Sequence, residues 1–577
     1  MIIKTNWRLK EQIEPSKEKD KMLLKNNFYR CFLLLSILSI ASCGVSKSIN
    51  HTPELDGYKS SVSERIRIND STFTSDKNSL VKNKNGQWEL YVSGDPLQIG
   101  LHTGNLTKEL YKKQELALFS KVNQMVPSEG WQNILRKLLA WYNRKIYLNV
   151  PEEYKTEIYG LSRYADNEYD FFAEPYLRAL YLHGAHDIGH ALQDLALVGC
   201  SSFAVWGDKT EDGNLIIGRN FDFYAGDDFA EEKIIAFVSP TQGHKFMSVT
   251  WGGMIGVVSG MNEHGLTVTI NAGKSDIPWV AKTPISIVTR EILQYASNIE
   301  EAIAIAKKRE VFVSESIFVG SAKDNKAVTI EVSPKNFGVY EVENTNRLIC
   351  TNHFQSSAYQ ADKKNKKHIK ESHSKYRYER LEELIGDDQK INPERAVSIL
   401  RNKAGLNEEA IGFGNEKALN QLLAHHGIVF QPSKRLVWVS SNPYQLGEFT
   451  AYDLNIVFNK TQNGTSFSSP NLNIEEDQFQ YTEAYENYEE NRILKRKVQT
   501  AISDKKHLEP SVLTKLQRTN PFLWENHYLV GVYNYNRGYY RVALNAFEKA
   551  KRLVITTVPD EEKLASYIKK TKRKLGK

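Results

Sequence analysis

Residues 198–203 read Val198-Gly199-Cys200-Ser201-Ser202-Phe203, and the pattern of the 577-residue sequence changes abruptly at this stretch. Before it, between Leu106 and Leu195, apolar residues recur at the spacing of helices. After it, the chain breaks into short runs that are rich in β-branched and aromatic residues. Turn signals such as Asp212-Gly213 and Glu263-His264-Gly265 separate these runs, which predicts antiparallel hairpins from Cys200 onward.

Helical periodicity returns twice within this strand-rich part of the chain. It predicts helices over Pro284–Tyr295 and Ile299–Lys308, and again over Lys375–Ile385 and Pro393–Asn402, with sets of strands before, between and after them. Such an order is typical of a layered α+β domain. We therefore expect an α+β domain over residues 200–460, preceded by a helical segment over residues 81–199.

Cys200 is a candidate nucleophile whose activation poses a chemical problem. A thiol reacts as the thiolate, and its ordinary pKa of about 8.5 calls for a nearby base or positive group. An N-terminal amine, with a pKa of about 7.7 to 8, suits that role. An internal cysteine gains such an amine when the bond before it is cut. Gly199 fits such a cut, because a residue without Cβ allows a strained backbone and lets the thiol attack the preceding carbonyl.

Several further motifs follow Cys200 in a fixed order. They are residues 212–222, Asp-Gly-Asn-Leu-Ile-Ile-Gly-Arg-Asn-Phe-Asp, then Gly260 to Leu266, Asn271, and Thr351-Asn352-His353-Phe354. Together with residues 198–203, this series resembles the N-terminal-nucleophile hydrolases of the autoproteolytic acyl-coenzyme A:6-aminopenicillanic acid acyltransferase-like family, which is related to choloylglycine hydrolases and acid ceramidase. The resemblance covers roughly residues 180–455. It implies a four-layer αββα sandwich, in which helices cover two antiparallel sheets.

The resemblance also implies a role for individual residues. Cys200 is the nucleophile freed by cleavage after Gly199, Arg219 favours the thiolate, and Asp222 orients the new amine. The amides of Asn271 and Asn352 donate to the oxyanion, and a second arginine is expected after them, for which Arg377 matches better than Arg380. Each pair of residues also has a structural alternative to its catalytic role. Arg219 and Asp222 would then form a surface ion pair, and Asn271 and Asn352 would cap turns. In a regular strand Arg219 and Asp222 point to opposite faces, so they converge only where the strand bends.

The reaction implied is hydrolysis of a linear amide in a small N-acyl substrate through an acyl-enzyme, without metal or organic cofactor. Acyl transfer to an amine is the alternative with the same nucleophile. A catalytically inactive lipoprotein scaffold that binds a partner is a second alternative. Papain-like catalysis is disfavoured, because Cys200 lacks the flanking cysteine and tryptophan of that family and enters a strand rather than a helix.

The start of the chain has the features of a targeting segment. Basic residues precede the apolar run Phe32–Ile40, which is too short to span a bilayer. The following Ile40-Ala41-Ser42-Cys43 resembles a bacterial lipoprotein box, so we expect a signal peptide over residues 1–43, lipid on Cys43 and a polar tether over residues 44–80. This places the protein in the bacterial cell envelope, on the periplasmic or outer-membrane side. Met1 and Met22 are both candidate starts.

Residues 470–577 are rich in Glu, Lys, Tyr and Asn at helical spacing, and part of them matches the small-and-large pattern of a tetratricopeptide helix pair. We interpret this region as helices packed on the enzyme, with protein-partner binding as the alternative. Nucleic-acid binding is disfavoured by a net charge of only +7 with interspersed signs. His183, His186 and His190 share helical spacing, but Asp187 is the one further ligand type nearby and Gly184 and Gly189 weaken a long helix, so a metal site there is disfavoured. Cys200 and Cys350 are expected to stay unpaired.

Overall fold

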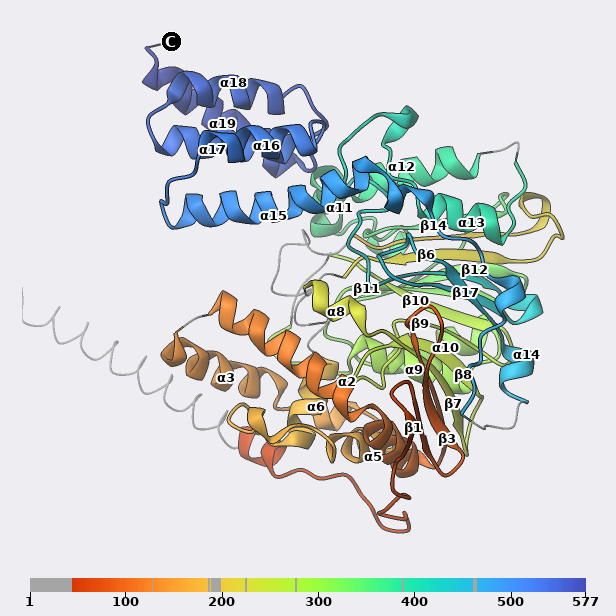
Figure 1. Cartoon of the computed structure of the whole chain (residues 1–577). Helices are drawn as coiled ribbons and strands as arrows, with labels where there is room; N and C mark the ends of the chain where they lie inside the picture. Colours follow the sequence, from red (N-terminus) through yellow and green to blue (C-terminus); the bar gives the residue numbers. More distant parts are fainter. Residues whose placement is uncertain are drawn as a thin grey trace, which may run out of the picture.

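The computed structural model describes residues 44–126, 128–184, 187, 199–223, 226–274, 278–386, 389–459 and 464–576 (Figure 1). The predicted signal peptide and the lipidation site at Cys43 lie outside these residues. Within the described ranges, no helix combines the length and the apolar character needed to cross a bilayer.

Two β-sheets form the centre of the protein. The larger sheet has eleven strands, in the order β1 (Ile66–Asn69), β2 (Thr72–Ser75), β3 (Asn78–Lys82), β4 (Trp88–Gly94), β7 (Ile234–Pro240), β8 (Phe246–Thr250), β9 (Ser259–Asn262), β10 (Leu266–Ala272), β11 (Glu315–Ser321), β12 (Lys326–Val332) and β13 (Phe337–Tyr340). The smaller sheet has six, in the order β14 (Arg347–Cys350), β5 (Ser201–Val205), β6 (Ile216–Phe221), β15 (His426–Gln431), β16 (Leu436–Ser440) and β17 (Phe449–Asp453).

The predicted hairpins are present at both turn signals. Strands β5 and β6 pair antiparallel on either side of Asp212-Gly213, and β9 and β10 do so around Glu263-His264-Gly265. Gly213 and Gly265 take positive φ angles of 75° and 71°, a backbone conformation that favours glycine.

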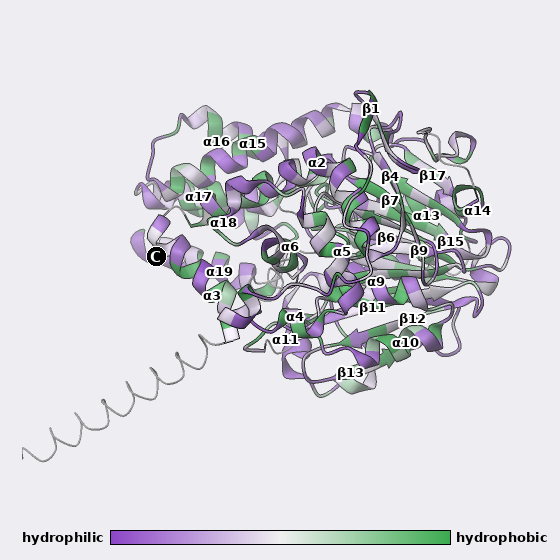
Figure 2. Cartoon of the chain, turned by 90° about the horizontal axis from the view of Figure 1, so that it is seen from below, coloured by the Kyte–Doolittle hydropathy of each residue, from purple (hydrophilic) through white to green (hydrophobic). Residues whose placement is uncertain are grey.

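The two sheets stack face to face over a shared apolar core. Apolar side chains of the smaller sheet, such as Ala204 and Ile217, belong to the same buried cluster as Phe237 and Met247 of the larger sheet. Alternation along each strand sends these residues inward, which is the packing expected of two sheets with one common core. Figure 2 shows that hydrophobic residues are concentrated in the central strands.

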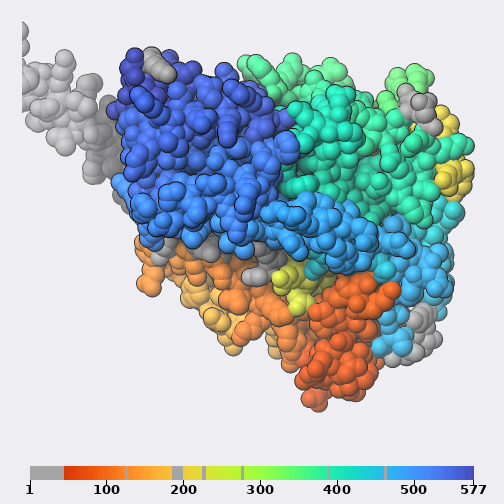
Figure 3. Space-filling view, turned by 45° about the horizontal axis from the view of Figure 1, so that its top comes forward, coloured from red at the N-terminus to blue at the C-terminus, as the bar shows by residue number. Residues whose placement is uncertain are grey.

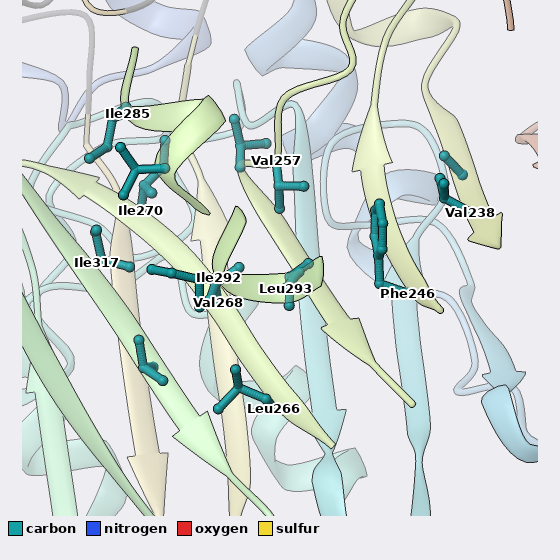
Figure 4. Packing of buried hydrophobic residues seen from close by; sticks show 14 of the residues in the cluster. Val238, Phe246, Val257, Leu266, Val268, Ile270, Ile285, Ile292, Leu293 and Ile317 are labelled. Atoms are coloured by element: carbon teal, nitrogen blue, oxygen red, sulfur yellow. The ribbon is translucent and has the colours of Figure 1, made fainter. Parts of the chain in front are cut away.

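Helices cover the outer face of each sheet. Helices α9 (Ile285–Tyr295) and α10 (Ile299–Lys308) pack on the larger sheet, and Figure 4 shows side chains of α9 lying over Val268, Ile270 and Ile317. Helices α12 (Ser374–Ile385) and α13 (Pro393–Leu400) pack on the smaller sheet. The layers are therefore helix, sheet, sheet, helix, and the predicted α+β class is confirmed.

The segment before Cys200 differs from the prediction. We expected a tether over residues 44–80 and a wholly helical segment over 81–199, but residues 66–94 contain strands β1 to β4. Strand β4 pairs in parallel with β7, which lies beyond Cys200 in the sequence. The polar residues that favoured a tether are hydrogen-bonded inside the sheet: the Asn78 side chain donates to the Ser75 carbonyl at 3.2 Å and accepts from the Ser93 amide at 2.8 Å. Local composition therefore misses these strands, because long-range pairing creates them.

Helices complete the segment before Cys200. They are α2 (Pro96–Met125), α3 (Glu129–Asn143), α4 (Ile146–Asn149), α5 (Glu152–Ser162) and α6 (Pro175–His183). A buried ion pair between Arg290 of α9 and Glu157 of α5, at 3.0 Å, joins this segment to the strand-rich domain. Because such contacts and the β4–β7 pairing do not depend on the bond after Gly199, the two parts can remain associated if that bond is cut.

A helical lobe ends the chain. It contains α15 (Glu483–Ser503), α16 (Pro510–Thr519), α17 (Trp524–Asn536), α18 (Tyr540–Ala550) and α19 (Val558–Lys574) around a separate apolar core. The lobe lies against the rest of the protein (Figure 3). At this contact Asn520 exchanges hydrogen bonds with the backbone of Phe413. Helix α17 approaches α18 closely, because a Cβ on Gly531 would lie 2.3 Å from the Phe547 ring. The helices are confirmed; their assignment to the tetratricopeptide class stays a prediction.

Shorter helical elements connect these layers. They are α8 (Asp227–Glu231), α11 (Lys363–Glu371), α14 (Leu454–Val457), and the 3-10 turns η1 (Asn167–Tyr169), η2 (Gly207–Lys209), η3 (Ser357–Tyr359), η4 (Leu406–Glu408), η5 (Pro432–Lys434), η6 (Pro470–Leu472) and η7 (Gln478–Tyr481).

Candidate active site at Cys200

Cys200 lies directly before β5, at one end of the smaller sheet. Ser201 of β5 pairs with Asn220 of β6, and Phe221 of β6 pairs with His426 of β15, so the three strands begin or end beside Cys200. The cysteine is 1% exposed. It enters a strand, as predicted, and this arrangement differs from the papain-like alternative.

Arg219 of β6 is the charged group nearest the sulfur. Its Nη2 lies 3.8 Å from the Cys200 Sγ, and the side chain is fully buried over the Phe221 ring. Burial raises the pKa of the Cys200 thiol to about 11, while Arg219 and the backbone N–H of Asp222 act in the opposite direction. In the uncut chain the thiol is therefore protonated at neutral pH.

Asp222 lies one residue beyond the end of β6, and that position resolves the geometric question raised by the sequence. Because the strand ends at Phe221, Asp222 does not have to follow the alternation of a regular strand, and both Arg219 and Asp222 act on the Cys200 sulfur. Its backbone carbonyl accepts a hydrogen bond from the Gly199 N–H at 3.3 Å. The Asp222 backbone therefore lies beside Gly199, and its carboxyl group is close enough to the Cys200 sulfur to raise the pKa of the thiol.

The carboxyl group of Asp222 is buried and unpaired. Among the described residues, no donor reaches either of its oxygens. Burial raises its pKa to about 7, against the opposing charges of Arg377 and Arg219. A buried carboxyl without hydrogen bonds is unfavourable, so this group is suited to a partner that the described part of the uncut chain does not provide.

The two carbonyls that flank the Gly199–Cys200 bond are held by side chains. Gln421 Nε2 donates to the Gly199 carbonyl at 3.0 Å, and Arg377 Nη1 donates to the Cys200 carbonyl at 2.6 Å. A Cβ on Gly199 would lie 2.0 Å from Gln421 Nε2. Glycine is therefore required here for the close approach of Gln421, a different reason from the backbone strain that we expected.

Gln421 was not identified from the sequence. It lies in a loop before β15, far from Gly199 along the chain, and nothing in its local sequence marks it. Glu315 at the start of β11 was missed for the same reason; this buried carboxylate also raises the pKa of the Cys200 thiol. Arg377, by contrast, is placed at the site as its motif indicated, with further bonds to Ser201 Oγ and Asn352 Oδ1.

The two predicted oxyanion donors are at the site but are engaged elsewhere. Both donated bonds of Asn271 Nδ2 go to backbone carbonyls, those of Cys350 at 3.0 Å and Thr351 at 3.2 Å. Asn352 Nδ2 donates to the Ala272 carbonyl at 3.0 Å. These bonds connect the ends of β10 and β14 and so join the two sheets. The oxyanion role of both residues stays a prediction, and for Asn271 it requires that a present bond be exchanged.

A chain of buried hydrogen bonds runs from Arg219 away from the sulfur. Arg219 Nη1 donates to Ser259 Oγ at 2.6 Å, Ser259 Oγ lies 2.9 Å from His426 Nε2, and the Nδ1 atoms of His426 and His425 are 2.8 Å apart. Burial holds the pKa of both histidines well below the ordinary value, so both are neutral. Arginine can only donate, so the Ser259 hydrogen is directed to His426 Nε2 and His426 donates from Nδ1.

The chain of bonds thus fixes the tautomer of each ring. His425 accepts at Nδ1 and carries its hydrogen on Nε2, which has no partner within the described residues and lies among Phe229 and Trp251. The arrangement anchors Arg219 on the side opposite the sulfur.

The other predicted residues are accounted for as follows. Cys200 and Cys350 are both free, which confirms that they form no disulfide with each other. His183 donates from Nδ1 to the Ala179 carbonyl and accepts from the Ile255 N–H at Nε2, so neither nitrogen is available to a metal. His186 and His190 lie outside the described residues.

Comparison with known proteins finds a family match over part of the chain. Residues 209–441 match the family model of acyl-coenzyme A:6-aminopenicillanic acid acyl-transferase. The matched residues make up less than half of the chain. The segment matched to the acyl-transferase family contains Arg219, Asp222, Asn271, Asn352 and Arg377, and begins shortly after Cys200.

Two individual relatives share less than 30% sequence identity with this chain. An uncharacterized protein of Archaeoglobus fulgidus is 28% identical over 276 residues, 44% of this chain and 45% of that protein. Protein dcd1B of Dictyostelium discoideum is 23% identical over 204 residues, 34% and 37% of the two chains. The chain thus spans less than half the length of these relatives.

Two solved structures show low similarity. One is the Caenorhabditis elegans ortholog of N-acylethanolamine-hydrolyzing acid amidase, with 20% identity, coverage of 41% of this chain and 93% of that chain, and a TM-score of 0.30. The other is a mutant conjugated bile acid hydrolase of Clostridium perfringens, with 14% identity, coverage of 47% and 96%, and a TM-score of 0.31. Scores this low do not by themselves establish a shared fold.

Replacing Ser259 tests the anchoring of Arg219. Ser259→Ala leaves Arg219 Nη1 and His426 Nε2 buried without their shared partner, which is expected to lower the free energy of unfolding by about 1–3 kcal/mol. Ser286→Ala is the matched control, because the Ser286 hydroxyl is equally buried but has no hydrogen-bond partner among the described residues. Denaturant titration measures both. Equal effects of the two substitutions would contradict the proposed anchoring.

The raised pKa of Asp222 predicts that the stability of the uncut chain depends on pH. Its folded pKa of about 7 exceeds the 3.8 of an unfolded aspartate, so the folded state holds a proton that the unfolded state releases. Stability from this group is present at low pH and is lost as the pH rises from about 4 to about 7. In a Cys200→Ala background, Asp222→Asn is expected to remove this slope in denaturant titrations. An unchanged slope would show that Asp222 is not a protonated buried acid.

Proposed function

We propose that this chain cuts itself between Gly199 and Cys200 and then hydrolyses a linear amide with Cys200 as an N-terminal nucleophile. The unpaired buried carboxyl of Asp222 beside this bond is the observation that carries the proposal. Cleavage would create an α-ammonium group on Cys200, and that ammonium would give the carboxyl a hydrogen-bond donor, which none of the described residues provides in the uncut chain.

The self-cleavage step uses groups that already contact the bond. The Cys200 sulfur attacks the Gly199 carbonyl carbon, and negative charge develops on the oxygen to which Gln421 Nε2 donates at 3.0 Å. The C–N bond breaks, a thioester forms, and the proton lost by the thiol passes to the departing Cys200 nitrogen. Asp222, with a pKa of about 7, suits the transfer of this proton at neutral pH. Water then hydrolyses the thioester and frees the thiol and the Gly199 carboxylate.

The freed amine supplies the base for the second reaction. With a pKa near 7.7 to 8 it accepts the thiol proton, while Arg219, 3.8 Å from the sulfur, stabilises the thiolate. The thiolate attacks the carbonyl of an N-acyl substrate, the amine product leaves with the proton, and water releases the acid from the acyl-enzyme. The family's name describes acyl transfer, which is the alternative outcome when an amine replaces water as the acceptor.

The cellular setting belongs to the proposal as well. We infer from Ile40-Ala41-Ser42-Cys43 that lipid on Cys43 anchors the protein in the bacterial envelope, where a small amide would be its substrate. Partner binding by the helical lobe is a further proposal without a specific contact to support it.

Substitution of Gln421 tests its proposed role in the cleavage step. Gln421→Ala removes the donor to the Gly199 carbonyl and is expected to slow processing by roughly 10²- to 10³-fold, as for other oxyanion donors. Gln445→Ala is the matched control, because Gln445 is also buried but its side chain has no hydrogen-bond partner among the described residues. Pulse-chase of the full-length band measures both rates. Equal processing of both variants would exclude the proposed role of Gln421.

The hydrolase step is tested on the same preparations. Processed protein is incubated with a panel of N-acyl amides, and mass spectrometry follows products and acyl adducts on the fragment that begins with Cys200. We expect turnover of at least one amide and an adduct that is absent from Cys200→Ala. Processing without adduct or turnover would instead favour the inactive scaffold.

A further inference from the structure

A second cluster of reactive side chains lies far from Cys200. His244, in the connection between β7 and β8, faces Glu263 and His264 in the turn between β9 and β10. One ligand-type atom from each of the three residues lies within 4.8 Å of the other two. The turn is at the opposite end of β10 from Asn271, about 20 Å away at the rise of a β-strand, so this cluster is separate from the candidate active site.

The two imidazoles are turned toward a common point. His264 Nε2 lies 3.1 Å from His244 Nδ1, close to the separation of about 3.3 Å that two nitrogens would have on one tetrahedral zinc ion. The rings meet edge to face at 73°, with centroids only 4.3 Å apart. A straight N–H···N bond would hold the centroids farther apart than this, so the nitrogens meet at an angle rather than end to end.

The backbone holds the three residues in place before any ion binds. The His244 N–H donates to the Gln294 carbonyl at 2.7 Å, and the His264 N–H donates to Asn262 Oδ1 at 3.0 Å. Residues 245 and 263 exchange two bonds: the Glu263 N–H donates to the Lys245 carbonyl, and the Lys245 N–H donates to Glu263 Oε1, both at 2.9 Å. Little conformational freedom is therefore left for binding to remove.

The surrounding charges permit a divalent cation. The carboxylates of Glu263 and Glu301 both act electrostatically on His244, and they would partly offset the charge of a bound cation. Arg435 also borders the cluster, but its Nε and Nη1 donate to the backbone carbonyls of residues 263, 432 and 433.

His244 and His264 line an open hollow of about 520 Å³, together with Ser297, Lys323 and Arg435. A metal held by three protein ligands would have a fourth position open to water from this hollow.

We infer that His244, Glu263 and His264 form a zinc-binding site that joins the two turns. Two imidazoles and one carboxylate match the ligand types and the number that zinc uses when one position stays open. The inference is independent of self-cleavage and of amide hydrolysis, because it involves no residue of the candidate active site.

The full-length protein tests this inference directly. After treatment with EDTA and desalting, the protein is titrated with ZnSO₄ against a chromophoric chelator, and retained zinc is measured by elemental mass spectrometry. We expect one zinc ion per chain in wild type, and an affinity lowered by at least about tenfold in His244→Ala and in His264→Ala. His507→Ala, which changes an exposed histidine outside the cluster, is expected to bind zinc like wild type.

The same titration separates the outcomes. Glu263→Gln keeps the size of the side chain and should weaken binding less than loss of either histidine, and Co²⁺ bound to wild type should give a tetrahedral absorption spectrum. Circular dichroism of each variant in EDTA verifies its fold. Zinc that is not retained by wild type, or is retained equally by the His244→Ala/His264→Ala double variant, would overturn the inference and leave a simple hydrogen bond between two histidines.

Discussion

The buried carboxyl group of Asp222 is the constraint around which the site is arranged. It lies at the Gly199–Cys200 bond without a hydrogen-bond donor among the described residues, although two arginines are near enough to lower its pKa. Burying an acid in this way is unfavourable unless it gains a partner. Under the proposed function that partner is the amine of Cys200, which exists only after the chain is cut. The same event would supply the nucleophile with its base, so one broken bond would resolve both deficiencies.

The two sheets build the site jointly. Cys200, Arg219 and Asp222 lie in or beside strands of the smaller sheet. From the larger sheet, Ser259 accepts a hydrogen bond from Arg219, and Asn271 donates to the carbonyls of Cys350 and Thr351. Arg377, from the helical layer over the smaller sheet, connects the Cys200 carbonyl with Asn352. Stacking of the sheets is therefore a requirement of the chemistry as well as of stability. The Arg290–Glu157 pair and the β4–β7 pairing would keep the two fragments together after cleavage.

Local sequence patterns correctly predicted the elements that are marked by hydrophobic periodicity and turn residues. The helix over Ile299–Lys308 coincides with the prediction, and antiparallel hairpins are present at both predicted turn signals. Strands β1 to β4 were missed, because polar residues such as Asn78 hide a sheet that depends on pairing with β7. Arg219, Asp222 and Arg377 were identified through the family resemblance. Gln421, Ser259 and His426 could not be identified from the sequence, because only folding brings them close to Gly199 and Arg219.

The proposed chemistry requires that the active protein begins a chain at Cys200. The most direct measurement is the intact mass of a freshly purified, catalytically active preparation, combined with N-terminal sequencing of its fragments. Self-cleavage predicts two fragments that meet between residues 199 and 200, with free cysteine at the start of the second. A fully active preparation in which the Gly199–Cys200 bond is intact would contradict it.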